Sequence, residues 1–241
     1  MYNLIISAAA AIVMFLILHL AVSAPLWISI PLALVAFLGI FYLISRIIMN
    51  KVMEILDAAT RDLQAQRVDK GIKTLKSALK YGKWQVYVTG QINAQVGMVY
   101  YMKRDFAAAF PYLEKAFFKN WVAMGMLAVS YMKRNRNDKM KETFEKALQG
   151  TPKESLLWSL YAYCLEETGD TAGAIAVLER GLKKLPAEER LTHNIEALKE
   201  GKRMKMKGYG EMWLQFHLEK QSVVMKHQAA AMGVRRRVIR R

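Results

Sequence analysis

Cysteine, histidine and carboxylate side chains are the residues of this chain that could support nucleophilic, metal or acid–base chemistry. None of the four histidines has the short spacing that brings two ligands onto one metal ion. The single cysteine, Cys164, offers no disulfide framework. Glu166 and Glu167 are adjacent, so on a helix they point in different directions and do not form an acid–base pair. Without a phosphate loop or nucleophile motif, the sequence gives no case for an enzyme, and no metal or cofactor is expected.

A basic tail is the next chemical feature. The net charge is +16, and eleven basic residues lie beyond Gly201, opposed there only by Glu211 and Glu219. Such a tail attracts phosphate groups. The predicted phosphate or lipid contacts are Arg235, Arg236, Arg237, Arg240 and Arg241. At a membrane surface the nearest phosphates belong to anionic lipid, which is the preferred interpretation. RNA binding and a merely solvated tail remain as alternatives.

The first fifty residues are apolar, with Arg46 as the only charged side chain between Tyr2 and Met49. About 20 apolar residues are enough to cross a bilayer as a helix. Two spans are predicted, at about residues 4–22 and 30–49, with Ser23-Ala24-Pro25 between them and Pro31 in the first turn of the second. A cleaved signal peptide is disfavoured because no cationic residue precedes the first run. Residues 1–50 are therefore predicted to form a transmembrane helical hairpin.

Basic residues near the ends of the spans predict the orientation of the hairpin. The short loop has none, whereas Arg46, Lys51, Arg61 and Arg67 follow the second span. By the positive-inside rule, the protein is expected to lie in the inner, cytoplasmic membrane as a multi-pass protein, with both termini and the polar part of the chain in the cytoplasm. Because no Gly, Ser or Pro linker follows Met49, one helix is predicted to continue to about Gln64.

After the hairpin, four blocks repeat one sparse pattern of small and large apolar residues. The anchor residues Gly71, Ala109, Met140 and Ala174 are spaced 38, 31 and 34 residues apart. Small residues let two helices approach closely, and an aromatic residue or Leu fills the remaining gap. The predicted helices are Val68–Tyr81, Trp84–Met102, Phe106–Lys119 (bent at Pro111), Trp121–Lys133, Asp138–Gln149, Glu154–Thr168 and Thr171–Lys184, with a capping box at Thr151–Glu154 and a helix joint at Gly169-Asp170.

This pattern resembles the tetratricopeptide repeat, a helix–turn–helix unit of 34 residues. The resemblance is to a bacterial-type membrane-anchored protein of that family. It implies an all-α fold in which the two-helix transmembrane hairpin is followed by a tetratricopeptide-like α-solenoid. About four pairs are expected in residues 51–186, then a capping helix in 187–200 and a basic tail in 201–241 with an aromatic helix at 209–219.

The resemblance also implies a function in protein binding, as a membrane-anchored scaffold or adaptor. The ligand groove of the family is lined by the first helix of each pair. We expect a partner helix or peptide to bind at Met98, Tyr101, Met102, Val129, Met132, Tyr163 and Glu166. Further positions at groove-facing offsets are Leu56, Thr60, Leu63, Ala94, Gly125, Lys133, Ser159 and Glu167. Roughly half of these side chains are expected to pack inside the repeats instead.

The aromatic cluster around Trp213 and Phe216 lies beyond the last repeat. Three placements are open for it: on the last repeat as part of the cap, in the groove, or against the membrane. Packing on the cap is preferred, because an exposed cluster of this size would otherwise be a binding patch.

Overall fold

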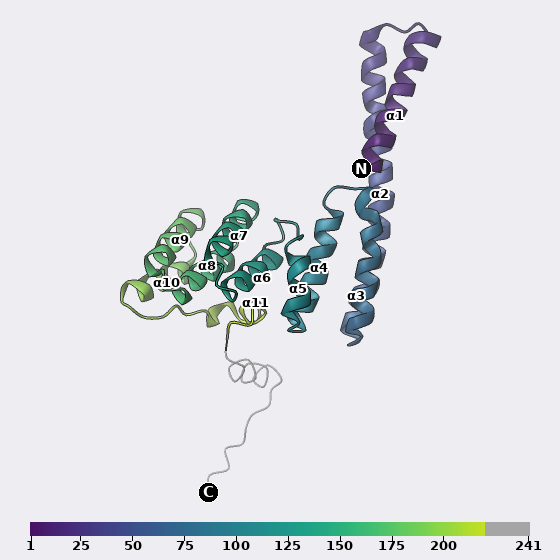
Figure 1. Ribbon diagram of the computed structural model, residues 1–241. Coiled ribbons are helices and arrows are strands. Elements are labelled where there is room, and N and C mark those ends of the chain that lie inside the picture. Colours follow the sequence, from purple (N-terminus) through teal and green to yellow (C-terminus); the bar gives the residue numbers. More distant parts are fainter. Residues whose placement is uncertain (220–241) are drawn as a thin grey trace. The chain divides into compact units, whose positions relative to one another are not determined.

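The computed structural model describes residues 1–219, and every regular element in that range is helical (Figure 1). The chain divides by its contacts into two compact units, Met1–Phe117 and Phe118–Arg241. The first unit contains α1 to α5, and the described part of the second contains α6 to α11.

The first unit begins with an antiparallel helical hairpin. α1 (Tyr2–Leu16) continues as a π-helical turn, Ile17–Ala21, and α2 (Leu26–Gln64) returns beside it (Figure 1). Asn3 Nδ2 donates a hydrogen bond to Ser45 Oγ over 2.6 Å and so ties the start of α1 to α2. At the other end, the ring of His19 bonds the backbone carbonyl of Ala24 over 3.1 Å. Both contacts satisfy polar groups within an otherwise apolar pair of helices.

Residues Tyr2–Ala21 and Leu26–Gln64 are each long and apolar enough to cross a membrane, by length and composition. α2 starts earlier than predicted, because Pro25, in an extended conformation, takes the N-cap position. Pro31 therefore lies inside the helix rather than in its first turn, and deprives one carbonyl of its usual donor. The prediction that one helix runs without a break to about Gln64 is confirmed.

α3 (Val68–Ser77) packs closely against the far half of α2. A Cβ atom added at Gly71 would lie 2.7 Å from Leu63 Cδ2 and 3.3 Å from the carbonyl oxygen of Ala59, so only glycine allows this approach. Ile48, Val52, Ile72 and Leu75 are among the buried residues of the core that the two helices share. The anchor predicted at Gly71 thus joins α2 and α3.

The next two helices are shorter than predicted. α3 passes into a 3₁₀ segment, Ala78–Lys83, and α4 (Val88–Met102) begins four residues late because Tyr87 has a left-handed backbone with φ of 71°. α5 (Phe106–Leu113) ends soon after Pro111 instead of continuing to Lys119. The N–H of Phe117 donates to the carbonyl of Gly90 over 3.1 Å rather than to its own helix. The chain after α5 is thus held by α4, and the predicted bend is in fact a helix end.

The second unit is built from two helix pairs and a further helix. α6 (Trp121–Met132) packs on α7 (Asn137–Gly150), α8 (Ser155–Glu167) packs on α9 (Thr171–Lys184), and α10 (Glu189–Lys199) follows beside α9. A Cβ added at Gly181 would lie 2.9 Å from the indole ring of Trp158. The predicted packing of a small residue against a large one is present at this position, as it is between Gly97 and Leu113 in the first unit.

The start of α8 differs from the capping box predicted at Thr151–Glu154. The hydroxyl of Thr151 donates back to the carbonyl of Ala147 in α7, over 3.0 Å. Thr151 is the C-cap residue of α7, and the N-cap residue of α8 is Glu154, which makes no side-chain capping bond. The carbonyl of Pro152 accepts from Trp158 Nε1 over 2.9 Å, which holds this connection against α8.

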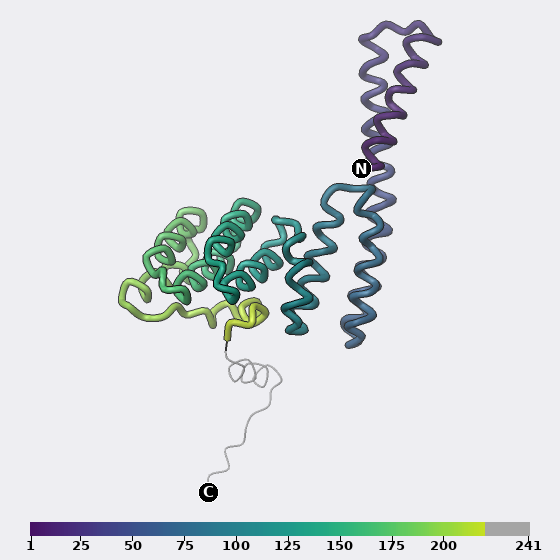
Figure 2. The backbone as a smooth tube through the Cα atoms, viewed as in Figure 1, coloured from purple at the N-terminus to yellow at the C-terminus, as the bar shows by residue number. Residues whose placement is uncertain are grey.

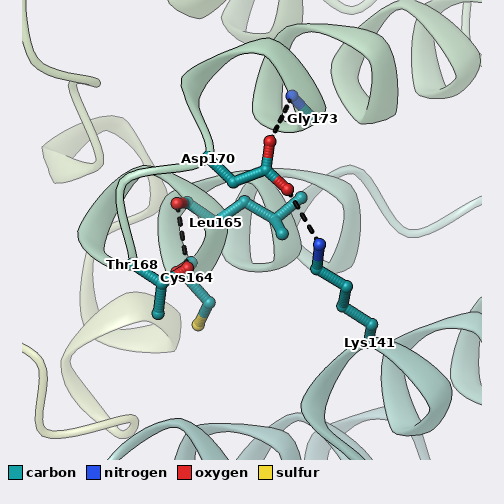
Figure 3. A network of polar contacts seen from close by, with 6 residues as sticks. All are labelled: Lys141, Cys164, Leu165, Thr168, Asp170 and Gly173. Atoms are coloured by element: carbon teal, nitrogen blue, oxygen red, sulfur yellow. Dashed lines mark hydrogen bonds and ion pairs between the residues drawn. The ribbon is translucent and has the colours of Figure 1, made fainter. Parts of the chain in front are cut away.

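The joint between α8 and α9 follows the prediction (Figure 3). Gly169 has a left-handed φ of 86°, and Asp170 caps α9 through Oδ1, which accepts from the N–H of Gly173 over 2.9 Å. Asp170 Oδ2 also accepts from Lys141 Nζ of α7 over 2.8 Å. The Lys141 ammonium, and then the Gly173 N–H, lower the pKa of Asp170. One carboxylate thus joins two helix pairs.

Replacing Asp170 separates its two roles. Asp170→Asn keeps a capping oxygen and loses the ion pair, whereas Asp170→Ala loses both, so we expect losses of about 0.5 kcal/mol and about 1–2 kcal/mol in the free energy of unfolding at pH 7. Because the folded-state pKa is lowered, this stabilisation is present above the ordinary pKa of Asp and disappears as the pH falls through the folded-state value. Denaturant unfolding at pH 7 and pH 3 measures it; a wild-type advantage over Asp170→Asn that is unchanged at pH 3 contradicts the assignment.

Candidate partner-binding groove

Beyond α10 the chain turns back and runs along the same unit (Figure 2). We call residues 203–219 the return segment. It contains a 3₁₀ turn, Lys207–Tyr209, and one helical turn, α11 (Glu211–Leu214). The prediction of one aromatic helix over residues 209–219 is therefore wrong. Gly210 has φ of 57° and ψ of −137°, and His217 has φ of 52°, so the backbone leaves the helical region at both places.

The first part of the return segment is extended and is held by side chains of α8 and α10. The N–H of Lys205 donates to Asn194 Oδ1 over 2.8 Å, and the N–H of Met204 donates to Glu166 Oε2 over 3.4 Å. Met204 and Met206 are buried. Backbone donors that lack a helical partner are thus satisfied by the repeat helices.

The second part places three aromatic side chains against α6 and α8. The hydroxyl of Tyr209 is hydrogen-bonded to that of Ser159 over 2.8 Å. The indole of Trp213, 1% exposed, meets the ring of Tyr163 edge to face with 4.8 Å between centroids. Phe216, 0% exposed, fills the space above Gly125, where an added Cβ would lie 2.9 Å from its ring.

Most groove positions predicted in the last two repeats contact the return segment. Besides Gly125, Ser159, Tyr163 and Glu166, Lys133 Nζ donates to the carbonyl of His217 over 3.3 Å, and Glu167 pairs with Arg203 over 3.3 Å. Trp213 and Phe216 therefore dock on the face where a ligand was expected. The preferred placement, on the last repeat as part of the cap, holds for Trp213, which packs on Tyr163 of α8, but not for Phe216, which lies against Gly125 of α6.

The prediction that Tyr101 and Val129 face the groove is wrong. Tyr101 is 1% exposed and packs edge to face on Phe106, and Val129 is 0% exposed in α6. Both belong to repeat interiors, since the small side chains near them let the helices close over these positions. Met98 and Met132 are half-buried, while Met102 is 52% exposed. For these three residues a role in partner binding stays a prediction.

Burial sets the protonation states on this face. It raises the pKa of Tyr163 to about 12, and it also raises the pKa of Tyr209 and of Glu166. Desolvation disfavours the charged form of each group. Burial thus disfavours charge on this face, and the face is suited to an apolar ligand with a few polar atoms.

Chemistry of other kinds has little support in the described part of the chain. Within residues 1–219, no three His, Cys, Asp or Glu side chains lie close enough together to hold a metal ion. Burial raises the pKa of the Cys164 thiol, which disfavours the thiolate. The predicted phosphate contacts Arg235, Arg236, Arg237, Arg240 and Arg241 lie outside the described residues.

Sequence reasoning missed the first part of the return segment. Met204 and Met206 alternate with lysines, which is the period of an extended chain with one buried side. This alternation of apolar and basic residues is a sequence signal for the segment, although the charges alone indicate only a basic tail. Asn194 had no local signal, because its carbonyl oxygen serves Lys205, eleven residues further along the chain.

The comparison with known families agrees with the helix pairs of the second unit. Residues 126–189 match the family described as tetratricopeptide repeat. The match includes all of α7, α8 and α9 and most of α6, and it does not extend over the first unit. The comparison with curated proteins gives no match for this chain. The repeat suggests a scaffold for protein–protein interaction.

The docking of the return segment depends on its buried aromatic residues. We expect Trp213→Ala to lower the free energy of unfolding of the second unit by about 3–5 kcal/mol and to speed trypsin cleavage after Lys205 and Lys207, since a large buried ring is lost. Met212→Ala is the matched control, because Met212 is 50% exposed in the same helical turn and should change stability by less than about 0.5 kcal/mol. Denaturant unfolding and timed proteolysis measure both. Equal behaviour of the two variants would show that the segment is not held by these contacts.

Proposed function

We propose that this chain is a membrane-anchored scaffold that binds an apolar segment of a partner protein on the face of α6 and α8. The observation that carries the proposal is that this face already accepts a chain segment whose aromatic side chains Tyr209, Trp213 and Phe216 are buried on it. The match of residues 126–189 to the tetratricopeptide repeat supports a role in protein binding.

The hairpin supports membrane anchoring. In the most apolar windows of its two helices, only 6% and 11% of the residues are buried. Leu20, Trp27 and Val35 are more than two-thirds exposed. Soluble proteins expose few large apolar side chains to this extent. A helix in the core of a soluble protein would bury such residues. A bilayer provides the apolar surroundings that these side chains need.

The positive-inside rule places the loop at Ser23 outside the cell and the repeats in the cytoplasm. Cysteines introduced at Ser23 and at Ala65, both exposed, test this topology, because the native Cys164 is buried and unreactive. A membrane-impermeant maleimide should label Ser23→Cys in intact cells, and Ala65→Cys only after permeabilisation. Labelling of Ala65→Cys in intact cells would reverse the proposed orientation. Loss of the protein from membranes at alkaline pH would contradict anchoring.

The return segment indicates which kind of ligand the face selects. It offers Tyr209, Trp213 and Phe216 from a largely non-helical chain, and it makes few backbone hydrogen bonds to the repeats. Aromatic anchors in pockets, surrounded by polar contacts at the edge, are typical of peptide-binding surfaces. We propose that a partner segment with similarly spaced aromatic residues binds in place of the return segment.

A labelled peptide of residues 203–219 tests this face. The wild-type protein in detergent should not bind it, since the tethered copy occupies the site, whereas a loosened variant, Trp213→Ala/Phe216→Ala, should bind with micromolar affinity by fluorescence anisotropy. Adding Tyr163→Glu in α8 should weaken the affinity for the peptide at least tenfold, because a charge would be buried under the ring of the peptide's Trp213. Ala176→Glu, at an exposed position of α9, is the control and should leave it unchanged. If the loosened variant binds no better than wild type, the face is not a ligand site.

A further inference from the structure

The connection between α3 and α4 contacts the hairpin near the chain start. The rings of Tyr2 and Trp84 meet edge to face with 5.5 Å between centroids. Met1, Leu4 and Phe41 from the hairpin, together with Trp84 and Val86 from the connection, line a small cavity of about 50 Å³. We call residues 80–87 the α3–α4 loop. It reaches back from the repeat region to the start of α1 and to Phe41 of α2.

The level of this contact along α2 follows from helix geometry. A helix rises about 1.5 Å per residue, so Trp27 and Arg46 are about 28 Å apart along α2, close to the roughly 30 Å thickness of a bilayer core. Phe41, which lines the cavity with Trp84, lies little more than one turn before Arg46. If the hairpin spans the bilayer as proposed, the α3–α4 loop is at the boundary between hydrocarbon and headgroups.

The side chains of the loop suit that boundary. Val86 is 42% exposed and Tyr87 is 59% exposed, although both are large and mainly apolar. Trp84 is half-buried, and Lys80 and Lys83 are exposed. Aromatic rings are enriched at the headgroup level, and lysines there attract anionic lipid phosphates. The loop thus combines the two kinds of side chain that an anionic membrane surface binds.

Backbone and polar features of the loop agree with this environment. Tyr87 adopts a left-handed φ of 71°, which is unfavourable for a residue with a side chain, and its ring packs at a tilt on that of Phe117 with 4.6 Å between centroids. Among the described residues, Asn3 Oδ1 and Gln85 Oε1 are buried without a hydrogen-bond partner, and both residues line the cavity. Water that enters this cavity from the headgroup region could satisfy such acceptors.

We propose that the α3–α4 loop is a second membrane contact, which binds an anionic phospholipid surface through Trp84, Val86 and Tyr87 at headgroup depth and through Lys80 and Lys83 at the phosphates. The inference rests on the proposed membrane anchoring of the hairpin. It adds a lipid-binding site in the repeat region, distinct from the basic tail.

Probe depth measures this contact in the full-length protein. An environment-sensitive fluorophore is attached at Val86→Cys in vesicles of zwitterionic and anionic phospholipid, and quenching by brominated lipid is recorded. Ala65→Cys at the end of α2 is the control, because about 19 residues of helix, or roughly 28 Å, separate it from Arg46. We expect at least threefold stronger quenching and a blue-shifted emission at position 86, with water-like emission at position 65.

Charge substitutions test the phosphate contact. Lys80→Gln/Lys83→Gln should reduce quenching at position 86 at least twofold in anionic vesicles and leave it unchanged in purely zwitterionic ones. Lys73→Gln, at an exposed position of α3, serves as the control. Lys76 is left unchanged because its ammonium contacts a tyrosine ring.

The outcomes separate this inference from the proposed anchoring. If the protein resists alkaline extraction from the vesicles while the probe at position 86 stays in water, the loop contact is overturned and anchoring stands. If alkaline buffer removes the protein from the vesicles, both proposals fail.

Discussion

Close approach of helices at glycines is the constraint on which both units depend. Gly71 against Leu63, Gly97 against Leu113 and Gly181 against Trp158 leave no space for a Cβ atom. Each contact brings two short amphipathic helices near enough to bury one shared apolar face, which neither helix could do alone. The helix faces left over after this pairing then become available, and the proposed binding face of α6 and α8 is one of them.

On the second unit, the remaining face of α6 and α8 is covered by residues from the same chain. The cover is specific: Tyr209, Trp213 and Phe216 each have their own partner, at Ser159, Tyr163 and Gly125. The segment has little regular structure of its own, so its conformation depends on the repeat helices. The same contacts therefore stabilise the unit and occupy its proposed binding surface.

Local patterns in the sequence predicted much of this structure, and tertiary contacts determined the rest. Periodicity and small-residue anchors indicated the helix pairs, the continuous α2 and the joint at Gly169-Asp170. The course of the chain after α5 was not predictable, because Phe117 bonds there to Gly90, which is distant in sequence. The groove offsets pointed to Ser159, Tyr163 and Glu166, which follow repeat register and contact the return segment. They misplaced Tyr101 and Val129, because one sequence does not show how far neighbouring helices close over a given position.

The covalent link between the return segment and the repeats affects competition for the face. A flexibly tethered ligand is present at its own site at an effective concentration in the millimolar range. A free partner with equal contacts and micromolar abundance would rarely displace it. A partner would compete with the return segment only if extra contacts raised its affinity, or if crowding onto the same bilayer raised its local concentration to a comparable value. The face would then respond to co-localisation rather than to the bulk concentration of its partner.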